Sequence, residues 1–183
     1  MRLLATLALL CCMAAAPALA QVNLLASNPL LVAAYKGDAE ETKRLLKAGR
    51  STETSDNEAR TALIWASVVG HVDTVGVILE FKPRLDHKDE LGNTALFYAA
   101  DRGHEGVVAR LVVAGADANV ENGQGMAPLM AAARNGHVVV ARLLIDAGAD
   151  VNQTDYTGRT VLDWARGGSA SRLGRLLRQA GAR

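Results

Sequence analysis

The sequence predicts an all-α solenoid of about five helix–turn–helix repeats with short hairpin tips between them. Three observations favour this class. Related triplets begin at Thr61, Thr94, Ala127 and Thr160, a constant period of 33 residues. Gly-His pairs recur in the same register at 70–71, 103–104 and 136–137, and Ala-Gly endings recur at 114–115, 147–148 and 180–181. A constant period of this length is typical of stacked repeats, in which each unit buries its apolar face against its neighbours.

The repeat unit resembles the ankyrin repeat over about residues 28–183. The resemblance is carried by Asp89-x-x-Gly92-x-Thr94-Ala95-Leu96, by the Gly-His pairs, and by the Ala-Gly-Ala-Asp-x-Asn text at 114–119 and 147–152. It implies paired helices stacked side by side, a ridge of hairpin tips and a concave face lined by the first helices. The family's Thr-Pro-Leu-His motif is incomplete, since the His is missing from every copy and is replaced by Ile, Phe or Met in the three middle ones.

The repeats are expected at about 28–56, 57–89, 90–122, 123–155 and 156–183. In the first repeat Asn28 and Pro29 begin a helix well, because Asn caps it and Pro suits the first turn. Gly37 ends this helix, and a second is expected over about Ala39–Lys47 with Gly49 as its left-handed cap. No complete hairpin precedes this repeat, as expected of a terminal unit.

The second repeat is the least regular. Ala59 stands where Gly92 and Gly158 stand in other copies, and Lys82 occupies a position that belongs to glycine elsewhere. A left-handed conformation is costly outside glycine, so we expect a locally altered turn at Lys82. The third and fourth repeats match the pattern best, although glycines at 123 and 125 beside Met126 predict a loose fourth tip.

The last helix is expected to close the array as a cap. Its apolar side chains should face inward and its polar ones outward, because an uncovered apolar end would aggregate. The inward set is Leu173, Leu176 and Leu177, and the outward set is Arg172, Arg175, Arg178 and Gln179.

Residues 1–20 are expected to be a signal peptide. Arg2 precedes an apolar run, and Ala18-Leu19-Ala20 is a small-residue cleavage pattern. We expect cleavage before Gln21, a lead-in over 21–27, and a periplasmic location, because the short Ala-rich leader looks bacterial. A retained anchor is the alternative, and a lipid on Cys12 is a lesser one. Both cysteines, at 11 and 12, leave with the leader, so the mature chain has no disulfide and no thiolate site.

The charge of the chain argues against nucleic acid as a partner. The net charge is +1, and it becomes 0 once Arg2 is removed. A neutral exported protein is a poor nucleic-acid binder. The residues from Tyr156 onward nevertheless carry +5, with Asp163 as their only acid. This Arg-rich end is interpreted first as a solvated outer face of the cap and second as a docking surface for an acidic partner.

No pattern predicts catalysis, a cofactor or a metal. His71, His104 and His137 occupy equivalent places in stacked helices roughly 8–10 Å apart, whereas ligands lie about 2 Å from one zinc ion. We therefore expect these imidazoles to satisfy backbone groups at the turns. The recurring aspartates are natural turn and cap residues, and there is no P-loop, dinucleotide fingerprint or Gly-x-Ser-x-Gly motif.

The predicted protein-binding residues are those that vary between copies, because the scaffold does not dictate them. They lie at the ends of the first helices and at the hairpin tips, and apolar members could form the centre of a patch with a charged rim. The set is Tyr35, Lys36, Asn57, Glu58, Arg60, Val68, Val69, Glu90, Leu91, Asn93, Asp101, Arg102, Gln124, Met126, Arg134, Asn135, Tyr156 and Arg159. Trp65, Tyr98 and Trp164 share one register position, which is interpreted as repeat packing or, alternatively, as part of the binding face.

The sequence therefore predicts a non-catalytic protein-binding scaffold. We expect a chain that is monomeric by itself, with a protein partner, no nucleic acid, and no membrane contact after the leader is removed. The resemblance to exported bacterial ankyrin proteins implies support of a periplasmic enzyme such as a catalase in oxidative defence. The alternative is an immunity protein that masks a toxin delivered to the periplasm. An enzyme or metal binder is the alternative of another class.

Overall fold

A computed structural model describes residues 28–165 and 171–183 of the chain. The expected leader and lead-in, residues 1–27, lie outside the described residues. The described part contains ten helices and no strand, which confirms the predicted all-helical repeat solenoid. The helices are α2 (Pro29–Lys36), α3 (Ala39–Lys47), α4 (Ala62–Val69), α5 (Val72–Leu79), α6 (Ala95–Arg102), α7 (Glu105–Ala114), α8 (Pro128–Asn135), α9 (Val138–Asp146), α10 (Val161–Trp164) and α11 (Arg172–Gln179).

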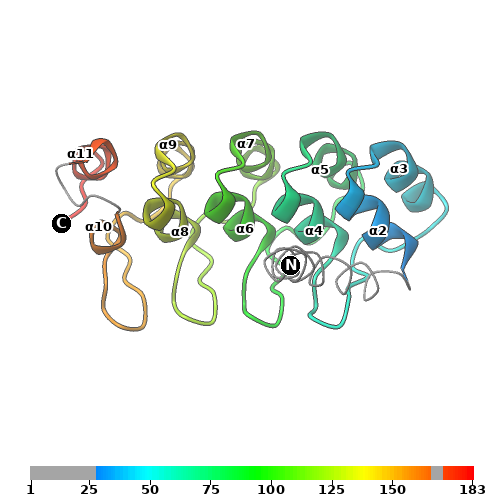
Figure 1. The fold of residues 1–183 in the computed structure, drawn as a ribbon, viewed down its shortest axis with the longest axis horizontal. Helices are drawn as coiled ribbons and strands as arrows, with labels where there is room; N and C mark the ends of the chain where they lie inside the picture. Colours follow the sequence, from blue (N-terminus) through cyan, green and yellow to red (C-terminus); the bar gives the residue numbers. More distant parts are fainter. Residues whose placement is uncertain (1–27, 166–170) are drawn as a thin grey trace, which may run out of the picture.

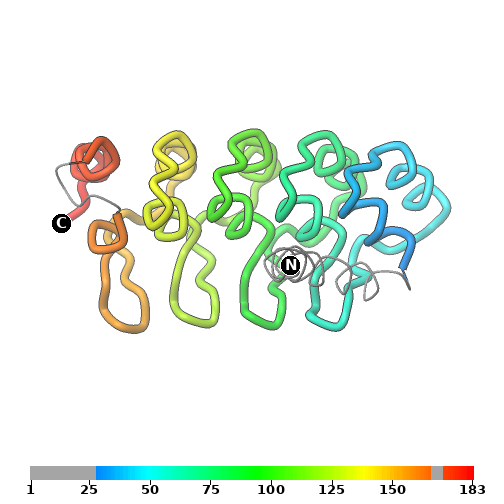
Figure 2. The backbone as a smooth tube through the Cα atoms, in the orientation of Figure 1, coloured from blue at the N-terminus to red at the C-terminus, as the bar shows by residue number. Residues whose placement is uncertain are grey.

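The helices form two parallel rows (Figure 1). The inner row contains α2, α4, α6, α8 and α10, each packed against the next, and the outer row contains α3, α5, α7, α9 and α11 in the same way. Long turns project from the inner row on the side away from the outer row (Figure 2). We call the surface made by these hairpin tips and the exposed sides of the inner helices the hairpin face. Within the described residues, no helix has the length and apolar character needed to cross a membrane.

The same small residues and leucines build the core in every repeat. Each of the first four inner helices contains a buried alanine at the same register position, and in the fifth repeat the equivalent alanine directly follows α10; these side chains are at most 5% exposed. The alanines are Ala33, Ala66, Ala99, Ala132 and Ala165. Leucines at the second position of the inner helix behave similarly in the first four repeats, where they are at most 1% exposed. Because a methyl group is short, neighbouring helices approach closely and bury their larger side chains between them.

Helix starts follow from local chemistry. Thr61, Thr94 and Thr160 each accept a hydrogen bond at the side-chain oxygen from the backbone N–H three residues later. Such a bond satisfies one of the donors that a helix start leaves unpaired. The fourth repeat has Ala127 at this position and instead begins its helix with Pro128, which has no N–H to satisfy and already holds the helical φ.

The last helix has the orientation expected of a cap. Leu173, Leu176 and Leu177 are at most 7% exposed, and α11 packs against α9 and α10. The arginines and the glutamine expected to face outward are exposed. The apolar end of the array is therefore covered by one amphipathic helix whose outer side is basic.

The turn at Lys82 is less altered than the sequence predicts. Lys82 has φ 51°, so it adopts the left-handed conformation of the glycine in other copies, and its N–H still bonds to the carbonyl of Leu79 at 3.1 Å. This turn differs from the others at the next residue, Pro83. In other copies the residue at that position donates its N–H to a carbonyl of the preceding helix, as Ala116 does to Leu111. Pro83 has no N–H, so the turn loses one hydrogen bond while keeping its shape.

Candidate functional site

An aspartate at the start of each regular hairpin organises the tip. Asp89 Oδ1 accepts the backbone N–H of Leu91 at 3.0 Å and of Asn93 at 2.8 Å. Asp56 and Asp155 accept the amides two and four residues later in the same way. Asp and Asn side chains commonly close turns by bonding to backbone amides a few residues on. Each tip is therefore held by one buried or half-buried side chain.

The second oxygen of the same aspartate binds the aromatic residue nine positions later. Trp65 Nε1 donates to Asp56 at 2.8 Å, the Tyr98 hydroxyl to Asp89 at 2.6 Å, and Trp164 Nε1 to Asp155 at 3.0 Å. This hydrogen bond ties the hairpin to its own inner helix. We did not predict this bond from the sequence, although an Asp followed nine residues later by a Trp or Tyr in three repeats is a usable signal.

The fourth repeat replaces both partners together. Its tip begins with Asn122, and the aromatic position holds Ala131. This repeat therefore has no aromatic donor that needs an acceptor. Where the aspartates have their second oxygen, Asn122 has its amide nitrogen Nδ2, which donates to Asn93 Oδ1 at 2.9 Å. Asn93 in turn donates to the Tyr98 hydroxyl at 3.1 Å. A chain of hydrogen bonds thus joins the third and fourth hairpins and their helices.

These contacts shift two pKa values. Burial would raise the pKa of Asp155, but hydrogen bonds from the Thr157 hydroxyl, the amides of Arg159 and Thr157, and Trp164 outweigh it and hold that pKa far below its usual range. Burial first, and then the hydrogen bond to Asp89, raise the pKa of Tyr98. Tyr98 is therefore a neutral donor and Asp155 a charged acceptor at neutral pH.

We predict that Asp155→Asn lowers the free energy of unfolding, and that this penalty shrinks at acid pH. Asparagine would place an amide nitrogen against Trp164 Nε1 and Arg159 Nε, which are both donors. The pKa of Asp155 is lower in the folded state than the unfolded value of about 3.9, so its stabilisation is present above that pH and is lost as pH falls below it. Urea unfolding at pH 7 and at pH 3 measures the difference. A penalty that is equal at both pH values would contradict this account.

Hydrogen bonds between repeats fix the position of the hairpin face. The tips are joined by backbone bonds from Glu90 N–H to Glu58, Gly123 N–H to Leu91, and Tyr156 N–H to Gln124, at 2.9–3.1 Å. The histidines act at the opposite ends of the inner helices. His71, His104 and His137 place Nε2 at 3.1–3.2 Å from the carbonyls of Tyr35, Val68 and Asp101, each in the preceding repeat. The interpretation of these imidazoles as backbone partners is confirmed by this geometry.

The predicted binding residues divide by exposure. The exposed ones are Lys36, Asn57, Glu58, Val69, Glu90, Leu91, Arg102, Gln124, Tyr156 and Arg159. Those of intermediate exposure are Tyr35, Arg60, Val68, Asp101, Arg134 and Asn135. The remaining two, Asn93 and Met126, are 6% and 1% exposed.

Asn93 and Met126 are therefore buried and offer a partner almost no accessible surface. Asn93 is buried because both ends of its amide are used between the third and fourth hairpins. Met126 is buried, and its N–H bonds to Asn122 Oδ1 at 3.0 Å. The expected looseness of the fourth tip is also corrected, since Asn122 holds it as the aspartates hold the others.

Several charged members of the predicted set already have partners within the chain. Arg134 pairs with Asp101 at 2.6 Å, and Asn135 donates to the same carboxylate at 2.7 Å. Arg159 pairs with Asp155 at 3.1 Å and stacks on Trp164. Arg60 pairs with Glu58 and lies over Trp65. These side chains are held in place before any partner arrives.

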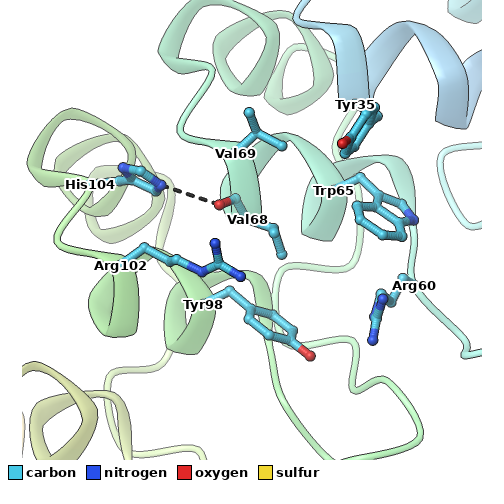
Figure 3. Close-up of a pocket in the computed structure, with 8 residues that line it drawn as sticks. All are labelled: Tyr35, Arg60, Trp65, Val68, Val69, Tyr98, Arg102 and His104. Carbon is cyan, nitrogen blue, oxygen red and sulfur yellow. Dashed lines mark hydrogen bonds between the residues drawn. The ribbon is translucent and has the colours of Figure 1, made fainter. Parts of the chain in front are cut away.

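Two neighbouring hollows lie on the hairpin face. The first hollow, about 450 Å³, is lined by Tyr35, Arg60, Trp65, Val68, Val69, Tyr98, Arg102 and His104 (Figure 3). The second, about 430 Å³, is lined by Glu90, Leu91, Asn93, Phe97, Tyr98, Asp101, Asn122, Gly123, Gln124, Met126 and Arg134. Tyr98 contributes to both, so the two hollows are adjacent. The hollows span the first four repeats and collect most of the predicted set, whereas Tyr156 and Arg159 lie beyond them on the fifth.

Two of the aromatic residues at the shared register position take part both in packing within the repeat and in lining the candidate binding surface. Trp65 and Tyr98 line the first hollow, and each also bonds to the aspartate of its own hairpin. Tyr35 meets Trp65 edge to face with ring centres 5.4 Å apart. The hollow consequently has rigid aromatic walls. In residues 28–165 and 171–183, no group of three or more His, Cys, Asp or Glu side chains could hold a metal ion.

The fold and this surface define a helical repeat solenoid that presents a preformed face of hollows and hairpin tips. The protein-family model described as ankyrin repeats (3 copies) matches residues 6–89, 30–122 and 96–182. The chain belongs to the ankyrin-repeat family, a family of protein–protein interaction modules that are in general non-catalytic scaffolds. No match to a curated protein sequence was found.

Proposed function

We propose that this protein binds a protein partner through the hairpin face, centred on the two hollows. The observation that carries the proposal is a set of exposed apolar side chains on an otherwise hydrogen-bonded, rigid surface. Val69 is 38%, Leu91 62% and Tyr156 71% exposed, and all three lie on the hairpin face. Exposed apolar groups surrounded by ordered polar ones are typical of the centre of an interface. Because the backbone there is already fixed, binding would cost little ordering entropy.

The test is a binding measurement with matched variants. A partner captured from a periplasmic extract by the mature chain is purified, and its affinity is measured by calorimetry. Val69→Asp and Leu91→Asp should each weaken binding by about 2 kcal/mol or more if they are central anchors. Val113→Asp is the control, because Val113 is 88% exposed but lies on the outer helix α7. Circular dichroism must show that all three variants keep the fold.

The opposite pattern of binding losses would place the binding site on another surface. If the two hairpin-face variants bind normally while Arg178→Ala on α11 does not, the basic cap is the docking surface, and the proposal is wrong. Loss of binding in Val113→Asp alone would place the partner on the outer helices.

We further propose that the protein acts in the periplasm after removal of residues 1–20. The leader pattern supports this location. N-terminal sequencing of the fractionated protein should begin at Gln21, and an intact Met1 or an acylated Cys12 would exclude it. For the role, support of a periplasmic enzyme such as a catalase is proposed first, and masking of a periplasm-delivered toxin second. Loss of catalase activity in a deletion strain supports the former, and sensitivity to a neighbouring toxin supports the latter.

A further inference from the structure

The first hollow contains a cation with no counter-charge. The side chain of Arg102 extends from α6 into the hollow towards Val68 and Tyr98 (Figure 3). Arg102 is exposed, and its side chain has no hydrogen-bond or ion-pair partner among the described residues. The other cation of the hollow, Arg60, is only 16% exposed in its side chain and is neutralised by Glu58, with Asp89 3.7 Å away. The accessible charge in the first hollow is therefore positive.

The surroundings of Arg102 favour a planar, hydrogen-bonded ligand. Val68, Val69 and the rings of Trp65 and Tyr98 line the same hollow and partly exclude water. A guanidinium presents paired N–H donors that match the two oxygens of a carboxylate. Such a pair gains strength where nonpolar walls lower the local dielectric.

The second hollow has the opposite character. Its cation, Arg134, is already paired with Asp101 at 2.6 Å. The carboxylate of Glu90, exposed on its rim, has no hydrogen-bond or ion-pair partner among the described residues. Exposed Leu91 is its apolar contact. A ligand that lies across both hollows would therefore meet a positive end at the first and a negative, apolar end at the second.

We propose that the partner presents an extended segment with an Asp or Glu side chain that binds Arg102 in the first hollow and an apolar side chain that lies over Leu91. The proposal rests on the proposed function and adds the chemistry of the recognised segment. A second acid over the second hollow would face Glu90 and be repelled, so the segment is expected to carry a single acid at a fixed distance from its apolar residue.

The test is a selection from a random peptide library displayed between two flanking sequences, so that no free terminal carboxylate is present. The wild-type chain should enrich peptides with Asp or Glu at one position, a fixed number of residues from an apolar one. Arg102→Glu should lose that enrichment and prefer Lys or Arg at the same position. Arg142→Gln on α9, an exposed arginine outside both hollows, should select as the wild type does.

One selected peptide then measures the pairing. Fluorescence anisotropy should show about tenfold or greater loss of affinity for Arg102→Gln, the size expected of a charge-assisted hydrogen bond. Changing the peptide's acid to its amide should give a similar loss with the wild type and little further loss with Arg102→Gln. Leu91→Ala should weaken binding without changing the acid preference.

Three results would overturn the proposal. They are selection of no peptide, selection without acid enrichment, and equal acid enrichment by Arg102→Glu. Peptides that lack an acid but bind in a manner sensitive to Val69→Asp would leave the proposed binding face intact while rejecting the role of Arg102. The experiment therefore tests the binding face and the acid recognition by Arg102 separately.

Discussion

Gly103→Ala should destabilise the array much more than Gly136→Ala, although both glycines have almost the same backbone conformation. Gly103 has φ 76° and Gly136 has φ 77°, and each ends an inner helix. They differ in what a Cβ atom would meet. At Gly103 it would lie 2.6 Å from the ring of His137, whereas at Gly136 nothing lies within 4 Å.

The expected losses have two components, one from backbone conformation and one from steric clash. A left-handed alanine costs roughly 1–2 kcal/mol, and this applies at both positions. Forcing an extra carbon into a packed contact costs roughly 1–3 kcal/mol more, and this applies only at Gly103. We therefore expect a loss of about 1–2 kcal/mol for Gly136→Ala and about 2–5 kcal/mol for Gly103→Ala in the free energy of unfolding measured with urea.

The double variant Gly103→Ala/His137→Ala is the internal control. Removing the imidazole removes the clash, so the double variant should be destabilised by less than the sum of the two single variants. His137→Ala alone still loses the contact of Nε2 with the Asp101 carbonyl at 3.1 Å. Equal losses for Gly103→Ala and Gly136→Ala would show that the histidine moves aside freely and does not bind the repeats together.

Ending the chain at residue 170 should cause partial unfolding or self-association. This truncation removes α11, and with it Leu173, Leu176 and Leu177, which are at most 7% exposed. Burying one such side chain contributes about 1.5–3 kcal/mol, while a whole domain is stable by only about 5–15 kcal/mol. The uncovered side of α9 would also become an exposed apolar patch.

Light scattering after size exclusion and the helical circular dichroism signal measure this effect. Leu177→Ala is a milder version, since Leu177 is 0% exposed and a buried Leu→Ala substitution costs about 2–5 kcal/mol. Arg172→Ala on the exposed side of the same helix should change stability by no more than about 0.5 kcal/mol. A truncated chain that stays monomeric with unchanged helix content would reject the cap assignment.

The sequence by itself determined the fold class and the role of the periodic residues. A 33-residue repeat of alanine, leucine and Gly-His pairs can bury its apolar faces only by stacking, and the structure has that arrangement. The positions of Gly37 and Gly49 and the inward leucines of the last helix follow from local rules of capping and periodicity. These rules depend on neighbours within about one turn of helix, which a sequence displays directly.

Only the tertiary structure decided which variable residues are accessible and which are already engaged. Asn93 and Met126 vary between copies as Leu91 and Arg102 do, yet the first two are buried and the last two are exposed. Arg134 and Arg102 both lie at the end of an inner helix, but Arg134 meets Asp101 of the previous repeat at 2.6 Å. Such differences arise from contacts between residues about 30 positions apart. Their geometry depends on how one repeat is rotated and shifted on the next, and no local pattern encodes that relation.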